Sequence, residues 1–452
     1  MKTHPKLPLL PRIHRDSIPP LRGGLPLGIA LILLRSAAPT LGATLTVTTG
    51  ADGVAGSLRE RIAAAAPGDT IAFDASLNGQ TLVLTRGELV IGKPLTVIGP
   101  GATNLTLSGN GRTRLLRIAN GTPSITVSLA GLTFTGGNGQ GGGFSGRGGA
   151  IYNDHAVLIV SNCVVSASSA EEVAGGIYNF GANGGTASLT LLHSTIHGNS
   201  AINAGGGVFN GGLNGNATTT LRNCTLSDNT SGQGGALFNY GENGRAALTV
   251  LNSTFADNRS VDHAGGIQNS FGTLTISHTL LAKGDVGVNF EGNGSINNLG
   301  FNLSDDDSTT AFAPNAGSLR LGPLAMNGGT APTHALLPGS PAMDAGTNGP
   351  IVELPFDQRG PGFDRIANGR ADLGAYEVQS PRGRLVGITA GDLTLQFTGE
   401  PDEALNIEWN STASTTGWHL LTTRSTDATG LLEYPDPGAA GQPQRFYRAV
   451  RP

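Results

Sequence analysis

Short alternations of apolar and polar residues run through the middle of the chain, and no helical period separates them. The stretches LTLLHSTIHGN from Leu189 and LTVLNSTFADN from Leu248 are two examples. An alternation of period two is typical of strands that bury one face. Because Gly, Asn or Asp interrupts each run after roughly four to six residues, the pattern predicts an all-β chain of many short strands.

A glycine-rich motif that ends in asparagine occurs five times in the same region. The asparagines of the five copies are Asn153, Asn179, Asn210, Asn239 and Asn269. A repeat of about 30 residues that holds several strands predicts a β-solenoid. Equivalent residues then stack about 4.8 Å apart, so we expect the asparagines to form a structural ladder. We also expect them to occupy left-handed corners and to bond amide to amide.

Two further ladders follow from the same alignment. The second contains Asn162, His193, Asn223, Asn252 and His278, and the third contains Asn199, Asn229 and Asn258. Cys163 and Cys224 share one position two rungs apart, which is roughly 9 to 10 Å. Because a disulfide needs Cα atoms that are closer, the sequence predicts two free, buried thiols.

The start of the chain differs from the repeats. Basic residues precede the apolar run LPLGIALILL from Leu25, and small residues follow it. The run is shorter than the roughly 20 residues that span a bilayer, so we interpret residues 1–43 as a cleaved export signal rather than an anchor. The mature protein would be extracellular or at the cell surface, with no membrane span.

Both ends of a solenoid need covering. Ser57 and Glu60 form a capping box, which predicts a short helix over residues 57–66 at the start of a coil spanning 44–300. Residues 301–380 are rich in Pro and Gly and should cap the far end. Alternating strands from 384 to 452 predict a small β-sandwich-like domain.

Net charge bears on the partners. The chain carries a net charge of −4 and has a sequence pI of about 6.1. A chain without a broad basic surface is a poor binder of nucleic acid, so this partner is excluded.

Several phrases resemble known exported proteins. GGAIYN and FADN resemble the repeat of polymorphic outer-membrane proteins, which implies a right-handed parallel β-helix of the pectin-lyase type. The stretch TGADGVAGSLRERIAAAAPGDTIAFD is similar to the CSLREA element, although Gly56 stands where that element has cysteine and Arg61 where it has alanine. LGPLAMNGGTAPTHALLPGSPAMDAGTN resembles the "choice-of-anchor" terminus of bacterial surface proteins, and the last segment resembles fibronectin-type-III-like modules.

Carboxylates supply the candidate chemistry. Asp228 and Asp257 precede the third ladder in consecutive rungs, about 5 Å apart, and Arg222 is near in sequence. Such a pair could act in acid–base catalysis, but Asp-Asn is also a common corner pair. A second cluster, Asp305, Asp306 and Asp307, could bind calcium or form a surface turn.

Two functions remain open. The first is a non-catalytic exported β-helix, adhesin-like or a surface scaffold, that binds extracellular glycans or cell-surface components without a cofactor. The alternative is a polysaccharide lyase or glycoside hydrolase of the pectin-lyase-like fold. Converging Asp, Glu, Lys and Arg on one outer face would favour the enzyme, whereas ladders of Asn, Ser and Thr favour the scaffold.

Overall fold

The computed structural model describes residues 42–119, 124–309, 312–314, 317–349, 354–389, 392–400, 402–412, 416–427, 430–439 and 444–452. The export signal expected over residues 1–43 lies almost wholly outside these ranges. Among the described residues, no helix has both the length and the apolar character needed to cross a membrane.

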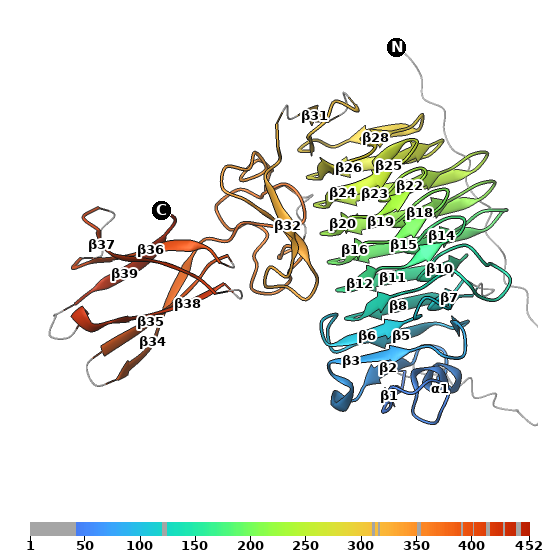
Figure 1. Cartoon of the computed structure of the whole chain (residues 1–452), viewed down its shortest axis with the longest axis horizontal. Helices are drawn as coiled ribbons and strands as arrows, with labels where there is room; N and C mark the ends of the chain where they lie inside the picture. The colour runs from blue at the N-terminus through green and yellow to red at the C-terminus, as the bar shows by residue number, and fades with distance from the viewer. Residues whose placement is uncertain are drawn as a thin grey trace, which may run out of the picture. The chain divides into compact units, whose positions relative to one another are not determined.

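Three parallel sheets wind into a β-solenoid (Figure 1). Sheet A contains β1 (Thr44–Val47), β2 (Thr70–Phe73), β5 (Leu95–Ile98), β8 (Thr126–Ala130), β11 (Val157–Ser161), β15 (Thr186–Leu192), β19 (Asn216–Arg222), β23 (Arg245–Leu251), β26 (Thr273–Ser277) and β29 (Ser295–Asn298). Sheet C contains β4 (Leu89–Ile91), β7 (Leu116–Ile118), β10 (Ile151–Asp154), β14 (Ile177–Phe180), β18 (Val208–Gly211), β22 (Leu237–Tyr240), β25 (Ala264–Ser270) and β28 (Val288–Glu291).

In each turn the chain passes from sheet A to sheet B and then to sheet C. Sheet B contains β3 (Gln80–Val83), β6 (Leu105–Ser108), β9 (Thr133–Thr135), β12 (Val164–Ser166), β16 (Thr195–His197), β20 (Thr225–Ser227), β24 (Thr254–Ser260), β27 (Leu280–Lys283), β30 (Leu303–Ser304) and β31 (Ala313–Pro314). Short strands β13 (Ser169–Ala170), β17 (Ser200–Ala201) and β21 (Thr230–Ser231) stack beside it and join β24. Sheet A has ten strands and sheet C eight, so the complete turns number about eight.

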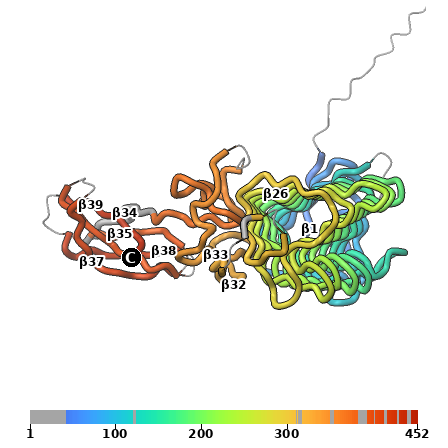
Figure 2. The backbone as a smooth tube through the Cα atoms, turned by 90° about the horizontal axis from the view of Figure 1, so that it is seen from above, coloured from blue at the N-terminus to red at the C-terminus, as the bar shows by residue number. Residues whose placement is uncertain are grey.

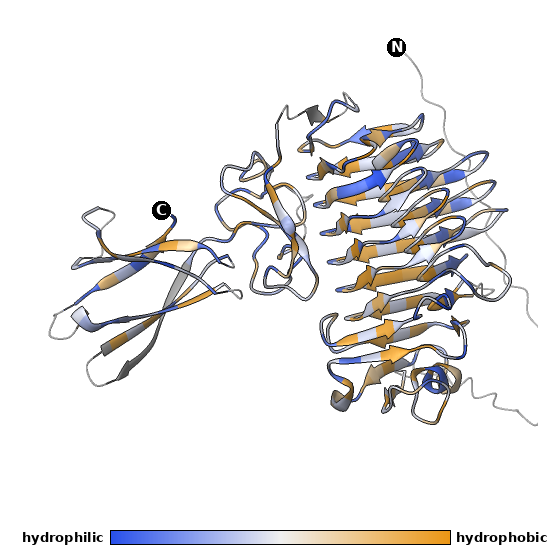
Figure 3. Ribbon diagram, in the orientation of Figure 1, coloured by the Kyte–Doolittle hydropathy of each residue, from blue (hydrophilic) through white to orange (hydrophobic). Residues whose placement is uncertain are grey.

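Aliphatic side chains fill the inside of the coil, because every other residue of a strand points inward. Hydrophobic residues recur along the stacked strands (Figure 3). One row of sheet B consists of Val165, Ile196, Leu226, Phe255 and Leu281, each 0 or 1% exposed. Burial of each such side chain contributes about 1.5–3 kcal/mol. A slip of one residue would turn the whole row outward, so this alternation fixes the register.

The first asparagine ladder lies inside strands of sheet C, not at corners. Asn153, Asn179, Asn210, Asn239 and Asn269 are in register and 0% exposed. The first four amide groups each donate to the next side-chain carbonyl at 2.7 or 2.8 Å, and Asn269 donates to Ser295 O. None of them has a positive φ, so the expectation of a left-handed corner is wrong for this row. An inward-pointing strand residue needs no corner conformation.

Left-handed corners belong to the other two ladders. Residues of the second ladder have φ between 46° and 50°: Asn162, His193, Asn223, Asn252 and His278. In the third ladder the left-handed residue comes one position earlier, at Gly198, Asp228 and Asp257. There the following asparagines stack, with Asn199 Nδ2 at 3.0 Å from Asn229 Oδ1.

Both cysteines are free and buried, as the sequence predicts. The main-chain N–H groups of Cys163 and Cys224 donate to Ser194 and Ser253 of the next rungs. Burial raises the pKa of both thiols to about 12.

Neither thiol should therefore react with a thiol-exchange reagent at pH 8 while the protein is folded, because the thiolate is the reactive form. Both should react once denaturant unfolds the chain, and counting modified cysteines by mass checks this. Modification of Cys163 or Cys224 at the rate of a free thiol in native buffer would contradict it.

The first turn is covered by helix α1 (Leu58–Ala64), which follows β1, and the short 3-10 helix η1 (Ala75–Leu77) follows β2. Ser57 Oγ accepts from the main-chain N–H of Glu60, as in a capping box. The Glu60 carboxylate accepts from Gly56 N–H. Leu58 and Ile62 are buried and join the core of the coil.

The other end of the coil is covered by a much shorter segment than residues 301–380. Strands β30 and β31 continue sheet B, and Phe312, 2% exposed, packs with its ring 5.7 Å from that of Phe290. Residues 317–380, which we call the lateral segment, contact the side of the coil instead (Figure 2). The segment includes the hairpin of β32 (Leu321–Ala325) and β33 (Thr333–Leu336).

A row of threonines on the outer face of sheet B holds the lateral segment. Thr195, Thr225 and Thr254 are in register on successive strands. They bond to Pro332 O, to Gln358 Oε1 and to the main-chain N–H of Ala375. Corner histidines add contacts, since His193 Nδ1 lies 2.9 Å from Asp357 O and His278 Nε2 lies 3.0 Å from Thr347 N.

The C-terminal part forms two antiparallel sheets of three strands, in agreement with the expected sandwich-like domain. One contains β34 (Arg382–Thr389), β35 (Asp392–Thr398) and β38 (Leu431–Asp436), and the other contains β37 (His419–Ser425), β36 (Ala404–Asn410) and β39 (Phe446–Val450), with the turn η2 (Pro437–Ala439) between β38 and β39. Leu395, Phe397, Leu405, Ile407 and Leu432 are buried between them.

Candidate functional site

A cavity of about 540 Å³ opens at the corner between sheets B and C. Three strips of chain line it: residues 83–88, 110–113 and 140–142. Each strip follows one of three successive strands of sheet B, namely β3, β6 and β9. The parallel stacking of the coil therefore brings residues about one repeat apart into one wall.

Neutral polar side chains form part of the lining, beside apolar and charged ones. Thr85, Asn110 and Gln140 contribute groups that donate and accept hydrogen bonds. Asn110 is left-handed, with a φ of 51°, which makes the turn after β6 tight. A Cβ at Gly141 would lie 2.4 Å from Glu88 Oε2, so only glycine lets this loop approach the carboxylate.

A buried ion pair forms the back of the cavity. Glu88 Oε2 lies 2.5 Å from Arg114 Nη1, and Glu88 Oε1 lies 3.7 Å from Arg117 Nε. The Arg114 side chain is 0% exposed and also donates to the carbonyl oxygens of Gly139 and Gly148. Burial lowers the pKa of Arg114, and the Glu88 carboxylate opposes this shift. Arg114 therefore fixes the glycine-rich loop that walls the cavity.

Asp154 and His155, predicted from the sequence as a loop dipeptide with no role, continue this charged cluster. Asp154 Oδ2 lies 3.5 Å from Arg117 Nη1, and Asp154 Oδ1 lies 2.7 Å from His155 Nδ1. The other ring nitrogen of His155 lies 2.9 Å from Ala182 O. Nearby, the Tyr152 hydroxyl is buried and has no hydrogen-bond partner among the described residues.

A row of aromatic rings covers the outer face of sheet C. Tyr152, Tyr178, Phe209 and Phe238 are in register, with neighbouring ring centroids 5.1 or 5.2 Å apart. They are 0 to 7% exposed, so the rings form a second packed layer rather than an open platform. The signal was present in the sequence, since each ring directly precedes an asparagine of the first ladder.

The structure separates the carboxylate pair from its proposed arginine. Asp228 and Asp257 are exposed and left-handed, on consecutive rungs of sheet B. Arg222 ends β19 in sheet A, at the opposite end of β20 from Asp228. The nearest histidines, His197 and His334, have a pKa lowered by burial, an effect that Asp228 and Asp257 respectively oppose. His334 Nε2 also lies 2.9 Å from Ser227 Oγ.

Of the aspartates at 305–307, Asp305 and Asp306 accept hydrogen bonds within the last turns of the coil. Asp305 accepts from the main-chain N–H of Lys283. Asp306 accepts from the hydroxyl of Ser308 and from the main-chain N–H of Asn289. Among the described residues, no group of three or more His, Cys, Asp or Glu side chains could hold a metal ion. Calcium binding by these aspartates stays a prediction.

Comparisons with known proteins include a distant match to a solved structure. No family model matches the chain, and no curated protein matches it. A solved structure described as "Structure of PL6 family alginate lyase AlyGC" is 14% identical, with a TM-score of 0.21. The match covers 60% of this chain and spans 52% of that chain. A likeness this weak informs neither on the fold nor on the activity of the chain.

Proposed function

We propose that this protein is an exported, non-catalytic β-helix that binds a saccharide chain in the cavity between sheets B and C. The observation that carries the proposal is the cavity itself, about 540 Å³ in volume and lined by Thr85, Asn110 and Gln140 on three successive turns. Sugar hydroxyls donate and accept hydrogen bonds, and side-chain amides and hydroxyls do the same. Ligand sites of this size hold a small number of sugar units.

Export and surface attachment are supported by the sequence resemblances alone. The apolar run from Leu25, the CSLREA-like stretch and the choice-of-anchor-like terminus all occur in proteins that act outside the cell. An extracellular saccharide or cell-surface component is then the natural partner, and an adhesin-like or scaffold role follows.

The absence of catalysis is supported by how the carboxylates are used. Glu88, the carboxylate that lines the cavity, is already paired with Arg114. Asp228 and Asp257 are exposed on sheet B, whose outer threonines are occupied by the lateral segment. General acid–base catalysis needs a titratable group within reach of the substrate, and neither arrangement supplies one.

The alternative is a polysaccharide lyase or glycoside hydrolase, and one cluster favours it. Asp154 and His155 lie in contact behind the cavity wall, next to Arg117. If the glycine-rich loop moved, this pair could act on a bound sugar as acid and base.

Binding and cleavage can be tested in one experiment with the full chain and a panel of neutral and acidic polysaccharides. Gln140→Ala should weaken binding about 3- to 10-fold, the usual effect of losing a neutral hydrogen bond. Thr218→Ala, on the exposed face of sheet A, is the matched control and should change nothing.

The double variant Asp228→Asn with Asp257→Asn should bind as the wild type does, and no polysaccharide should be cleaved. Reproducible cleavage by the wild type that is lost in this double variant, or in His155→Ala, would overturn the non-catalytic proposal. Normal binding by Gln140→Ala would place the saccharide outside the cavity.

A further inference from the structure

The cavity is cationic although the chain as a whole carries a net charge of −4. Arg86 and Arg112 both line it, and both are exposed. Neither forms an ion pair with another side chain in the part of the chain that the structure describes. Two arginines without an ion-pair partner among the described residues thus line the same space.

The carboxylates nearby are already neutralised by other arginines. Asp52 lies 2.7 Å from Arg59 Nε and accepts from the main-chain N–H groups of Thr85 and Arg86. Those hydrogen bonds and Arg59 lower the pKa of Asp52 against the opposing effect of burial. Glu88 is paired with Arg114 in the same way. The positive charge of the cavity therefore remains after the local ion pairs are counted.

Local structure fixes where both arginines project. The Arg86 side chain lies over Gly53 of the N-terminal cap, where a Cβ would approach its Cδ to 2.5 Å. Arg112 sits in the tight turn after β6, which Asn138 Nδ2 secures by donating to Gly111 O at 3.0 Å. Because the two arginines come from successive turns of one coil, their backbone positions are set before a ligand binds, and binding has to order only their side chains.

We infer that the ligand of this cavity is an anionic saccharide, whose carboxylate or sulfate group binds between Arg86 and Arg112. The inference rests on the proposed function and specifies its ligand class. Guanidinium groups match planar carboxylates and sulfate oxygens in geometry and bond them with charge assistance. Thr85, Asn110 and Gln140 on the same walls would take the neighbouring hydroxyls.

Matched polymers that differ only in charge test this inference. The full chain is titrated with polygalacturonate and with its fully methyl-esterified form, and with dextran sulfate and dextran. We expect binding to one or both charged polymers and at least about tenfold weaker binding to the neutral partner, the scale of a charge-assisted hydrogen bond. The first pair reports on carboxylate recognition and the second on sulfate recognition.

Single substitutions of arginine test whether the preference for charged polymers arises in the cavity. Arg86→Gln and Arg112→Gln should each weaken binding of the charged polymer by about tenfold or more, with an unchanged melting temperature. Arg245→Gln removes an exposed arginine at the start of β23, away from the cavity, and should have no effect. Competition of the wild type by monomeric galacturonate, but not by its methyl ester, gives the same answer without any variant.

The outcomes separate this inference from the proposed function. Equal binding of the charged and neutral polymers would overturn the inference and leave saccharide binding intact. Binding to none of the four polymers would overturn both. An equal loss in Arg245→Gln would show diffuse charge attraction and would also overturn the inference.

Discussion

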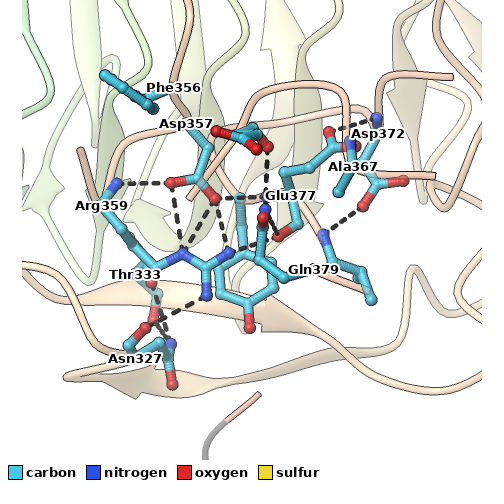
Figure 4. A network of polar contacts seen from close by, with 12 residues as sticks. Asn327, Thr333, Phe356, Asp357, Arg359, Ala367, Asp372, Glu377 and Gln379 are labelled. Carbon is cyan, nitrogen blue, oxygen red and sulfur yellow. Dashed lines mark hydrogen bonds and ion pairs between the residues drawn. The ribbon is translucent and has the colours of Figure 1, made fainter. Parts of the chain in front are cut away.

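Replacing Arg359 with methionine should lower the free energy of unfolding by about 3–5 kcal/mol, the cost of leaving a buried charge without its partner. The Arg359 side chain is 0% exposed in the lateral segment (Figure 4). Its Nε and Nη2 bond Asp357 Oδ2 at 3.0 and 2.8 Å, and its Nη1 bonds Glu400 Oε2 at 2.8 Å. The guanidinium also lies between two rings, with centroids 4.0 Å away in Phe363 and 3.8 Å away in Tyr376.

Loss of Arg359 should also loosen the attachment of the lateral segment to the coil. Asp357 would keep a buried carboxylate with no cation, although Glu377 N–H still donates to it. The carbonyl of Asp357 bonds His193, and the next residue, Gln358, bonds Thr225. Strain at Asp357 is therefore transmitted directly to these contacts with the coil.

Denaturant unfolding and hydrogen exchange of residues 354–380 check this prediction. Arg370→Met is the matched control, because Arg370 lies in the same segment but is exposed, and its side chain bonds only to Gly346 O among the residues that the structure describes. It should cost less than about 1 kcal/mol, as surface changes usually do. Equal stability of Arg359→Met and wild type, with unchanged exchange of the segment, would show that the buried ion pairs do not hold it.

The fold was predictable because a solenoid repeats its contacts. Each residue meets the equivalent residue one repeat away, so the sequence spacing of Asn153 and Asn179 already implies their contact. The lateral segment obeys no such period: His193 and Asp357 are separated by 164 positions. Its Pro- and Gly-rich composition indicates turns, but it does not indicate which surface those turns cover.

The cavity was missed for a different reason. Its arginines, Arg86 and Arg112, lie in the first turns, before the regular glycine-rich motifs begin, so no alignment of repeats places them side by side. Asp228 and Asp257 are predicted as a candidate pair because the alignment of repeats does place them on neighbouring rungs. Register alone says which residues are adjacent, whereas a binding site also depends on which surface stays open to solvent.

Asn210→Leu should lower the free energy of unfolding by about 2–5 kcal/mol, because three buried side chains each lose a hydrogen bond. Asn210 is 0% exposed in the middle of the first ladder. Its Nδ2 donates to Asn239 Oδ1 at 2.7 Å, and its Oδ1 accepts from Thr219 Oγ1 at 2.8 Å and from Asn179 Nδ2 at 2.8 Å. Leucine has a similar volume but satisfies none of these groups.

The cost should come from lost amide bonds alone, since Asn210 lies in extended strand and leucine strains no corner there. Asn216→Leu provides the control: Asn216 begins β19 with its side chain exposed, so its replacement should stay within about 0.5 kcal/mol of wild type. Denaturant midpoints of the two variants give the comparison. If Asn210→Leu unfolds at the wild-type midpoint, aliphatic packing can replace the ladder, and the asparagines would serve register rather than stability. A large loss in Asn210→Leu beside an unchanged Asn216→Leu would instead show that the coil depends on hydrogen bonds that pass through its core from one rung to the next.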